Sequence, residues 1–288
     1  MGSILWRAEY FSFFMLAEGR VYMRTISIIN LKGGCAKTLS SVNIAHILSA
    51  VHRKKVLLID NDKQGDASKL LNRHSYTRPG TGAILTDRGL DMAAVIQSTD
   101  YEGLDIVTAN MNLLTATLEV MLDQKRPQHN RFKKALEQVG EKYDYCIIDN
   151  APDINIAIIN ALAASDDVLV PVTIDDFAID GLRELEEQIN NTREDLNPGL
   201  RFCGCFITQY DRTNEADTQG EAYLKGLEAY PLFETHIRRT LKMKPSTFAR
   251  KPILEYSSRC GAARDYKALV EEYLGMCPSW TQSEGGES

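Results

Sequence analysis

Residues 30–38 read Asn-Leu-Lys-Gly-Gly-Cys-Ala-Lys-Thr; they follow a short apolar run, Thr25–Ile29, and precede a helix-like stretch, Leu39–Ser49. A strand, a glycine-containing loop, a Lys-Thr pair and a helix form the layout of a phosphate-binding loop. In such a loop backbone N–H groups converge on phosphate oxygens, and the helix N-terminus adds partial positive charge. On this layout Lys37 reaches the β- and γ-phosphates of a nucleotide, and the Thr38 hydroxyl binds Mg²⁺.

The strict P-loop pattern, G-x-x-x-x-G-K-[ST], fails at two positions of this loop, where Leu31 and Ala36 replace its glycines. The loop carries instead a second lysine, Lys32, directly before two glycines. It lies five residues before Lys37, so the two amines are difficult to place on one phosphate from the same side. Either Lys32 reaches a nucleotide held by another subunit, or it is a solvated loop lysine.

Two further apolar runs end in acidic residues. The first, Lys55–Asp66, contains Asp60 and Asp62, and the second, Tyr143–Asp149, closes on a carboxylate. Both are typical of buried parallel strands, and open α/β sheets bind ligands at the carboxyl ends of their strands. The loop and these carboxylates are therefore expected to meet at one edge, where phosphoryl transfer needs a lysine and Mg²⁺-binding carboxylates.

Together these motifs resemble the ParA/Soj-type partition ATPases, the deviant Walker A group of the MinD/ParA superfamily, whose hallmark is K-G-G-x-x-K-T. The resemblance extends from about Met23 to Leu274. The matching stretches are Lys32–Thr38, Leu58–Gly65, Ile147–Pro152, Asp167–Val172 and Lys251–Tyr256. It implies an α/β fold of the P-loop NTPase type, with a doubly wound, mostly parallel sheet and helices on both faces.

The resemblance also assigns roles to residues. Lys32 is expected to be the signature lysine that crosses an ATP-sandwich dimer, and Gly33 to let the two subunits approach closely. Lys37 corresponds to the Walker A lysine. The residues expected to bind ATP are Gly33, Gly34, Cys35, Ala36, Lys37, Thr38 and Leu39, with Thr208 and Asp211 near the base.

Three carboxylates complete the expected site. Asp62 is expected to orient or activate the attacking water, with Asp60 beside it near the metal, and Asp149 is expected to be the Walker B carboxylate. The expected metal ligands are Thr38, Asp60 and Asp149, and the expected catalytic residues are Lys32, Lys37, Asp60 and Asp62. The chain departs from the family at three positions, where Ala36, Lys63 and Asp66 replace Gly, Pro and Asn. A positive φ at Ala36 would cost roughly 1 kcal/mol or more.

Between Thr235 and Glu255 every charge is positive, although the net charge of the chain is −6. This basic segment contains Arg238, Arg239, Lys242, Lys244, Arg250 and Lys251. A charge run is often only a solvated face, but one without a compensating acid favours contact with the phosphate backbone of DNA. The resemblance agrees, since ParA-like proteins bind DNA nonspecifically through basic residues of their C-terminal half.

The function implied by the resemblance is DNA partitioning of a plasmid, a mobile element or a chromosome. A homodimer formed on ATP binding would bind double-stranded DNA, and slow hydrolysis, stimulated by a ParB-like centromere-binding protein, would release it. The protein is then expected in the cytoplasm, associated with the nucleoid and without membrane contact. Two alternatives stay open: a MinD-like ATPase that positions a cell-division or surface complex, and a small-molecule ATP-dependent enzyme on the same fold.

The composition, 44% hydrophobic and 25% charged over 288 residues, is that of a globular protein with a full core. None of the six cysteines forms a C-x-x-C pair, which argues against a zinc ribbon or a CxxC redox site. Strand alternation would direct Cys203 and Cys205 to one face. We expect residues 1–22 to be a non-native or disordered extension, 23–276 a single P-loop ATPase domain, and 277–288 a disordered tail.

Alternating strand and helix patterns predict a mostly parallel sheet covered on both sides. The expected strands are 24–30, 55–60, 104–108, 143–149, 167–173 and 201–208, with a weaker one near 232–235. The expected helices are 38–52, 82–98, 111–123, 129–140, 155–164, 178–195, 214–229 and 261–274.

Overall fold

The computed structural model describes residues 23–174, 178–227 and 229–277. The predictions for 1–22 and 278–288 lie outside these residues, and the single domain over 23–276 stays a prediction. Within the described residues eight strands form one sheet, in the order β3-β4-β2-β5-β1-β6-β7-β8. The strands are β1 Arg24–Ile28, β2 Val56–Asn61, β3 Ile96–Ser98, β4 Leu104–Val107, β5 Tyr145–Asn150, β6 Asp167–Val172, β7 Arg201–Tyr210 and β8 Ile237–Arg238.

The pairing confirms the predicted mostly parallel sheet, because every described strand pair is parallel except β3 with β4. The central strands β1, β2, β5 and β6 are buried along their whole length, as parallel strands covered on both faces must be.

The helices are α2 Lys37–Ala50, α3 Asp66–Leu70, α4 Thr81–Thr86, α5 Asn112–Leu122, α6 Arg131–Glu137, α7 Ile156–Ala163, α8 Ala178–Asp195, α9 Glu215–Lys225, α10 Met243–Phe248, α11 Ile253–Tyr256 and α12 Gly261–Met276, with a 3₁₀ turn at Met92–Ala94.

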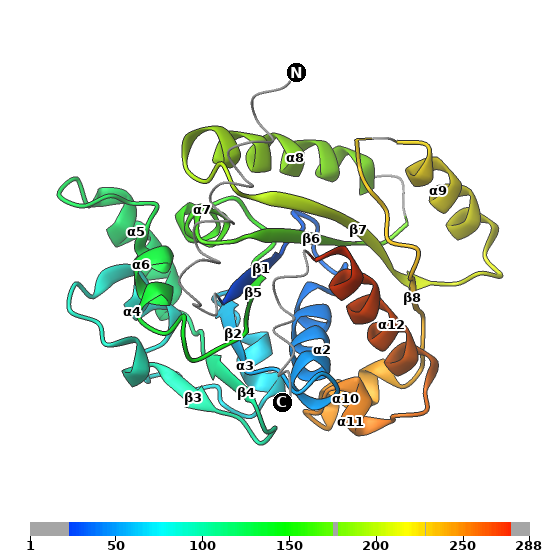
Figure 1. Ribbon diagram of the computed structural model, residues 1–288, viewed down its shortest axis with the longest axis horizontal. Coiled ribbons are helices and arrows are strands. Elements are labelled where there is room, and N and C mark those ends of the chain that lie inside the picture. The colour runs from blue at the N-terminus through cyan, green and yellow to red at the C-terminus, as the bar shows by residue number, and fades with distance from the viewer. Residues whose placement is uncertain (1–22, 175–177, 228, 278–288) are drawn as a thin grey trace, which may run out of the picture.

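The helices cover the sheet in two layers (Figure 1). On one face α2 and α12 pack together against the sheet, in a core cluster that includes Ile44, Ile147 and Tyr266. On the other face α4 to α7 form a second cluster, and α7, α8 and α9 form a third over β6 and β7. The sheet is therefore the middle of three layers, which is the doubly wound arrangement. No described helix is sufficiently long and apolar to span a bilayer.

One long helix was predicted wrongly. The stretch 82–98 is not one helix, because α4 ends at Thr86 and is followed by a 3₁₀ turn and the edge strand β3. The Asp87 side chain accepts the backbone N–H of Gly89 at 2.9 Å, and this turn leads the chain away from the helix axis. The weak strand near 232–235 is also corrected: Leu232 makes one isolated bridge, and β8 lies at Ile237–Arg238.

The two cysteines of β7 do not share a face. Cys203 belongs to the core cluster with Phe206, whereas Cys205 belongs to the cluster on the other side of the sheet with Ile207. The register between β6 and β7 shifts at this point, and Gly204 has a φ of 135°. A bulge of this kind interrupts the regular alternation, so the prediction of one shared face was wrong.

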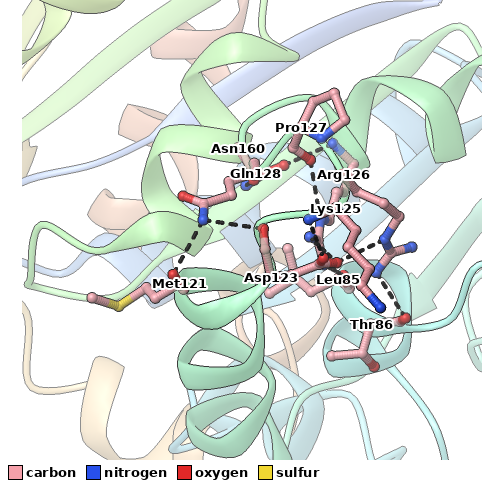
Figure 2. Close-up of polar contacts among 10 residues, drawn as sticks. Leu85, Thr86, Met121, Asp123, Lys125, Arg126, Pro127, Gln128 and Asn160 are labelled. Atoms are coloured by element: carbon pink, nitrogen blue, oxygen red, sulfur yellow. Dashed lines mark hydrogen bonds and ion pairs between the residues drawn. The ribbon is translucent and has the colours of Figure 1, made fainter.

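The connection between α5 and α6 is held by a polar network around Asp123 (Figure 2). Asp123 accepts hydrogen bonds from Arg126 Nε at 2.9 Å and Arg131 Nη2 at 3.0 Å, and these two guanidinium groups also donate to carbonyls at the end of α4. The Asn160 side chain joins α7 to the same loop through the Gln128 carbonyl, at 2.6 Å. The hydrogen bond from Arg126 holds the pKa of Asp123 down at about 2. Charge-assisted bonds thus fix this loop to α4 and α6, and a neutral amide bond fixes it to α7.

Candidate functional site

The carboxyl ends of three adjacent strands carry the residues that the sequence singled out. Asp60 of β2 is the register partner of Asp149 in β5, and Asp149 is the partner of Ile28 at the end of β1. The phosphate-binding loop leaves β1 at this point and enters α2 at Lys37. The predicted meeting of the loop with the two buried carboxylates is therefore confirmed in position.

Three carbonyl groups of the loop accept hydrogen bonds from side chains, one from the loop's own lysine and two from the end of β7. Lys32 O accepts Lys37 Nζ at 2.7 Å, Gly34 O accepts Gln209 Nε2 at 2.8 Å, and Cys35 O accepts Thr208 Oγ1 at 3.1 Å. Since the N–H of a peptide points opposite to its carbonyl, the two peptides whose carbonyls face β7 turn their N–H groups away from β7. Phosphate-binding loops bind anions through backbone N–H groups that face the ligand, and these two peptides fit that arrangement.

The first turn of α2 also fits an anion. No side chain caps its N-terminus, so the unpaired N–H groups of this turn need an outside acceptor. The N-cap residue, Ala36, has φ 66° and ψ 28°, a left-handed conformation that favours glycine. Ala36 therefore has the positive φ for which the sequence predicts a free-energy cost.

Asp60 and Asp149 form a buried acidic pair. Their exposed fractions are 0% and 1%, and burial raises the pKa of Asp60 to about 6. Burial and the neighbouring charge of Asp60 raise the pKa of Asp149 to about 8. Asp60 is held by Ser68, whose backbone N–H and hydroxyl donate at 2.8 and 2.6 Å. Asp149 Oδ1 accepts Ser41 Oγ at 2.9 Å, but its Oδ2 is buried without a hydrogen-bond partner.

This pair fits a divalent cation. Two carboxylates at a shared site resist ionising together, and a cation between them would remove that penalty. The Thr38 side chain belongs to the same group, since its proximity to Asp149 opposes the rise in the pKa of that carboxyl. The described residues contain no group of three or more His, Cys, Asp or Glu side chains suited to a metal. The donor set resembles that of Mg²⁺, which binds one or two carboxylates and completes its shell with phosphate oxygens and water.

The two acidic residues that follow Asp60 lie in the bend after β2 and at the start of α3. Asp62 is half-buried, and its side chain accepts the backbone N–H of Gln64 at 2.9 Å. Its own N–H donates to Asp60 Oδ1 at 3.2 Å, so it lies beside the acidic pair as expected. Asp66 begins α3 and forms an exposed ion pair with Lys69 at 2.9 Å.

The residues expected near the base have other contacts. Thr208 is buried, and its hydroxyl lies between the carbonyls of Cys35 and Val172. The Asp211 side chain accepts both the N–H and the hydroxyl of Thr213, which lowers its pKa. Their roles toward a base stay predictions. Burial raises the pKa of the Cys35 thiol, so this cysteine is a neutral filler of the loop.

Sequence reasoning overlooked Gln209. It follows Thr208 in β7, has φ 56°, and donates its side-chain amide to the loop at Gly34. A non-glycine residue with positive φ beside a ligand-binding loop is a feature that only coordinates reveal.

The basic segment is less uniform than its sequence. Arg238 forms two side-chain hydrogen bonds of 2.7 Å with Asp265 of α12, so its charge is compensated from outside the segment. The run itself contains no acid, as its sequence says, but the fold supplies one to this residue, and the role of Arg238 toward DNA stays a prediction. The other five cations of the basic segment are exposed and form no ion pair within the part of the chain that the structure describes, although Arg250 Nη1 donates to Asn72 Oδ1 at 3.3 Å; they are Arg239, Lys242, Lys244, Arg250 and Lys251.

A doubly wound sheet, a lysine-bearing phosphate loop and an acidic pair at neighbouring strand ends define a P-loop ATPase. The model of an AAA domain family matches residues 23–202. The chromosome partitioning protein ParA of Caulobacter vibrioides is 32% identical over 257 residues, which cover 88% of this chain and 94% of the relative. The sporulation initiation inhibitor protein Soj of Bacillus subtilis is 33% identical over 250 residues, or 86% and 97%. The chain belongs to the ParA/Soj family of partition ATPases.

Solved structures share the fold. The cobyrinic acid a,c-diamide synthase of Mycobacterium smegmatis, with bound ADP and magnesium, superposes with a TM-score of 0.78 at 24% identity, over 91% of this chain and 97% of that one. A putative plasmid partition protein of Borrelia burgdorferi bound to AMPPNP gives 0.74 at 23% identity, over 88% and 100%.

Proposed function

We propose that this ATPase partitions DNA of a plasmid, a mobile element or a chromosome, as an ATP-dependent sandwich dimer that binds DNA nonspecifically. A ParB-like centromere-binding protein stimulates its slow hydrolysis and thereby releases the DNA, and the protein acts in the cytoplasm on the nucleoid. The observation that carries the proposal is the loop with two carbonyls held by β7, beside an acidic pair whose Asp149 Oδ2 has no partner among the described residues.

ATP and Mg²⁺ are the ligands that this geometry fits. The loop and the first turn of α2 hold the phosphates, with Lys37 as the cation closest to them. The Thr38 hydroxyl, Asp60 and Asp149 hold the metal, which supplies neutralisation of charge on the transferring phosphoryl group. Asp62 orients the attacking water from the end of β2.

The dimer rests on Lys32 and Gly33. Gly33 is exposed, its φ is not positive, and a Cβ added there would meet no atom within 4 Å. Nothing within the described chain therefore requires glycine at this position, although a second subunit that approaches the loop closely would. Lys32 lies next to it and crosses to the nucleotide of the partner.

Gly33→Ala tests the dimer without disturbing the monomer. We expect the variant to keep its thermal unfolding temperature and to lose the dimer that light scattering detects with a nonhydrolysable ATP analogue and Mg²⁺. Lys32→Ala should lose the dimer as well, while the wild type with ADP stays monomeric. A Gly33→Ala protein that dimerises like the wild type would refute the close approach of the two loops.

The DNA-binding surface is tested best away from Arg238, which Asp265 already compensates. Removing Lys242 and Lys244 together should weaken binding to every sequence alike and reduce the salt dependence by about two phosphate contacts. Lys133→Ala/Lys134→Ala on α6 removes the same charge elsewhere and serves as the matched control. Equal loss of affinity in both double variants, measured by fluorescence anisotropy, would move the DNA-binding surface away from the basic segment.

A further inference from the structure

The last three residues of β7 contact both the phosphate loop and the basic segment. Thr208 donates its hydroxyl to Cys35 O at 3.1 Å, and Gln209 donates its amide to Gly34 O at 2.8 Å. Two successive residues of one strand thus hold two successive carbonyls of one loop. In a regular strand this is impossible, because successive side chains point to opposite faces.

A bulge at Gln209 makes the double contact possible. In the pairing with β8 the register shifts between Thr208 and Tyr210, which leaves Gln209 as the extra residue. Its φ of 56° turns its side chain toward the loop. Bulges commonly redirect a side chain next to a ligand site, and the left-handed conformation costs free energy that a regular strand would not. The backbone strain at Gln209 therefore accompanies one contact, the hydrogen bond from its side chain to the Gly34 carbonyl.

The same three residues support the basic segment. Tyr210 O accepts the backbone N–H of Arg239 at 2.9 Å, and β8 pairs with Thr208 and Tyr210. The Tyr210 ring also stacks on His236 at a centroid distance of 4.6 Å. An unbroken path of hydrogen bonds and covalent backbone thus runs from Gly34 through Gln209 and Tyr210 to Arg239.

We propose that Gln209 is a positioning residue of the phosphate loop, and that the end of β7 couples the state of this loop to the basic segment. The inference rests on the proposed ATP-dependent binding of DNA. When a nucleotide shifts the loop, the carbonyl of Gly34 moves with it and pulls on the bulge, which carries the backbone of Arg239. By thermodynamic reciprocity DNA must then tighten ATP binding by the same factor by which ATP tightens DNA binding.

Two variants separate positioning from a merely structural role. Gln209→Asn suits the left-handed conformation but has a side chain too short to reach Gly34 O, whereas Gln209→Lys is long and can donate. We expect Gln209→Asn to unfold at the same or a higher temperature than Gln209→Lys, yet to bind a fluorescent ATP analogue about three- to tenfold more weakly than the wild type, as loss of one hydrogen bond predicts. Gln209→Lys should retain most of the affinity.

Coupling is measured as the ratio of ATP dissociation constants without and with a mixed-sequence DNA duplex. We expect a ratio above one for the wild type and a ratio closer to one for Gln209→Asn. Wild-type ATP affinity in Gln209→Asn would overturn the positioning role. Weakened ATP binding with an unchanged ratio would overturn the coupling alone. A ratio of one in the wild type would refute the proposed dependence of DNA binding on ATP and the coupling with it, while the affinities of the two variants still decide the role of Gln209.

Discussion

Replacing Ala36 by glycine should stabilise the protein, although glycine usually destabilises a helix. Ala36 has φ 66° at the N-cap of α2. The left-handed conformation costs an L-residue about 1–2 kcal/mol, and glycine avoids this cost. Glycine loses about 0.5–1 kcal/mol more backbone entropy on folding, which leaves a net gain of about 1 kcal/mol or slightly less. At about 2–4 °C per kcal/mol for a large domain, the unfolding temperature rises by about 2–3 °C.

Urea unfolding gives the cleanest measurement. The midpoint of Ala36→Gly should increase with an unchanged slope, because the buried surface stays the same. Ala268→Gly is the matched control, since Ala268 is exposed within α12 and the same chemical change there should cost about 1 kcal/mol. A midpoint for Ala36→Gly that falls like that of the control would refute the assignment of backbone strain to the loop.

Two predictions concern buried carboxylates and pH. The raised pKa of Asp149, next to Asp60, means that ionisation of this carboxyl removes stability as pH rises from about 4 toward 8. Without nucleotide, Asp149→Asn should therefore unfold at a higher temperature than the wild type, by a margin that grows over this pH range. The variant should also lose the stabilisation that ATP and Mg²⁺ give to the wild type. A variant less stable than the wild type at pH 8 would contradict the acidic pair. Burial alone would raise the pKa of Asp167, but hydrogen bonds from Arg24 and Arg201 outweigh it and lower the value. Asp167→Asn should thus cost about 3–5 kcal/mol at pH 7 in urea titrations, since it leaves Arg24 buried beside a neutral amide. That difference should shrink as pH falls through the lowered pKa, and a difference independent of pH would show that packing rather than charge is lost.

The central strands and the loop could be predicted because their physics is local. A parallel strand covered on both faces needs an unbroken apolar run, and the acidic residues at its end mark the edge of the sheet. β2 and β5 match that pattern, and their pairing brings Asp60 opposite Asp149 as expected.

The errors and the contacts that the sequence did not reveal arose where tertiary contacts decide. β3 is a three-residue edge strand that exists through its pairing with β4, and the sequence of this stretch also fits a helix. The charge of Arg238 is compensated by Asp265, which lies 27 residues later and meets it only in the folded chain. The role of Gln209 depends on a bulge and a positive φ, neither of which has a signature in residue type.

The contact between Lys37 and its own loop has a consequence for how ligands arrive. The amine already donates to Lys32 O at 2.7 Å and approaches Cys35 Sγ at 3.8 Å. An incoming triphosphate therefore meets an ammonium group that is already oriented, and the amine exchanges one acceptor for another, so little side-chain entropy of Lys37 is lost on association. The selectivity of the loop for its ligand then depends on the charge of that ligand. A polyanion readily displaces the neutral Lys32 carbonyl from the ammonium group of Lys37, whereas a singly charged solute displaces it only weakly.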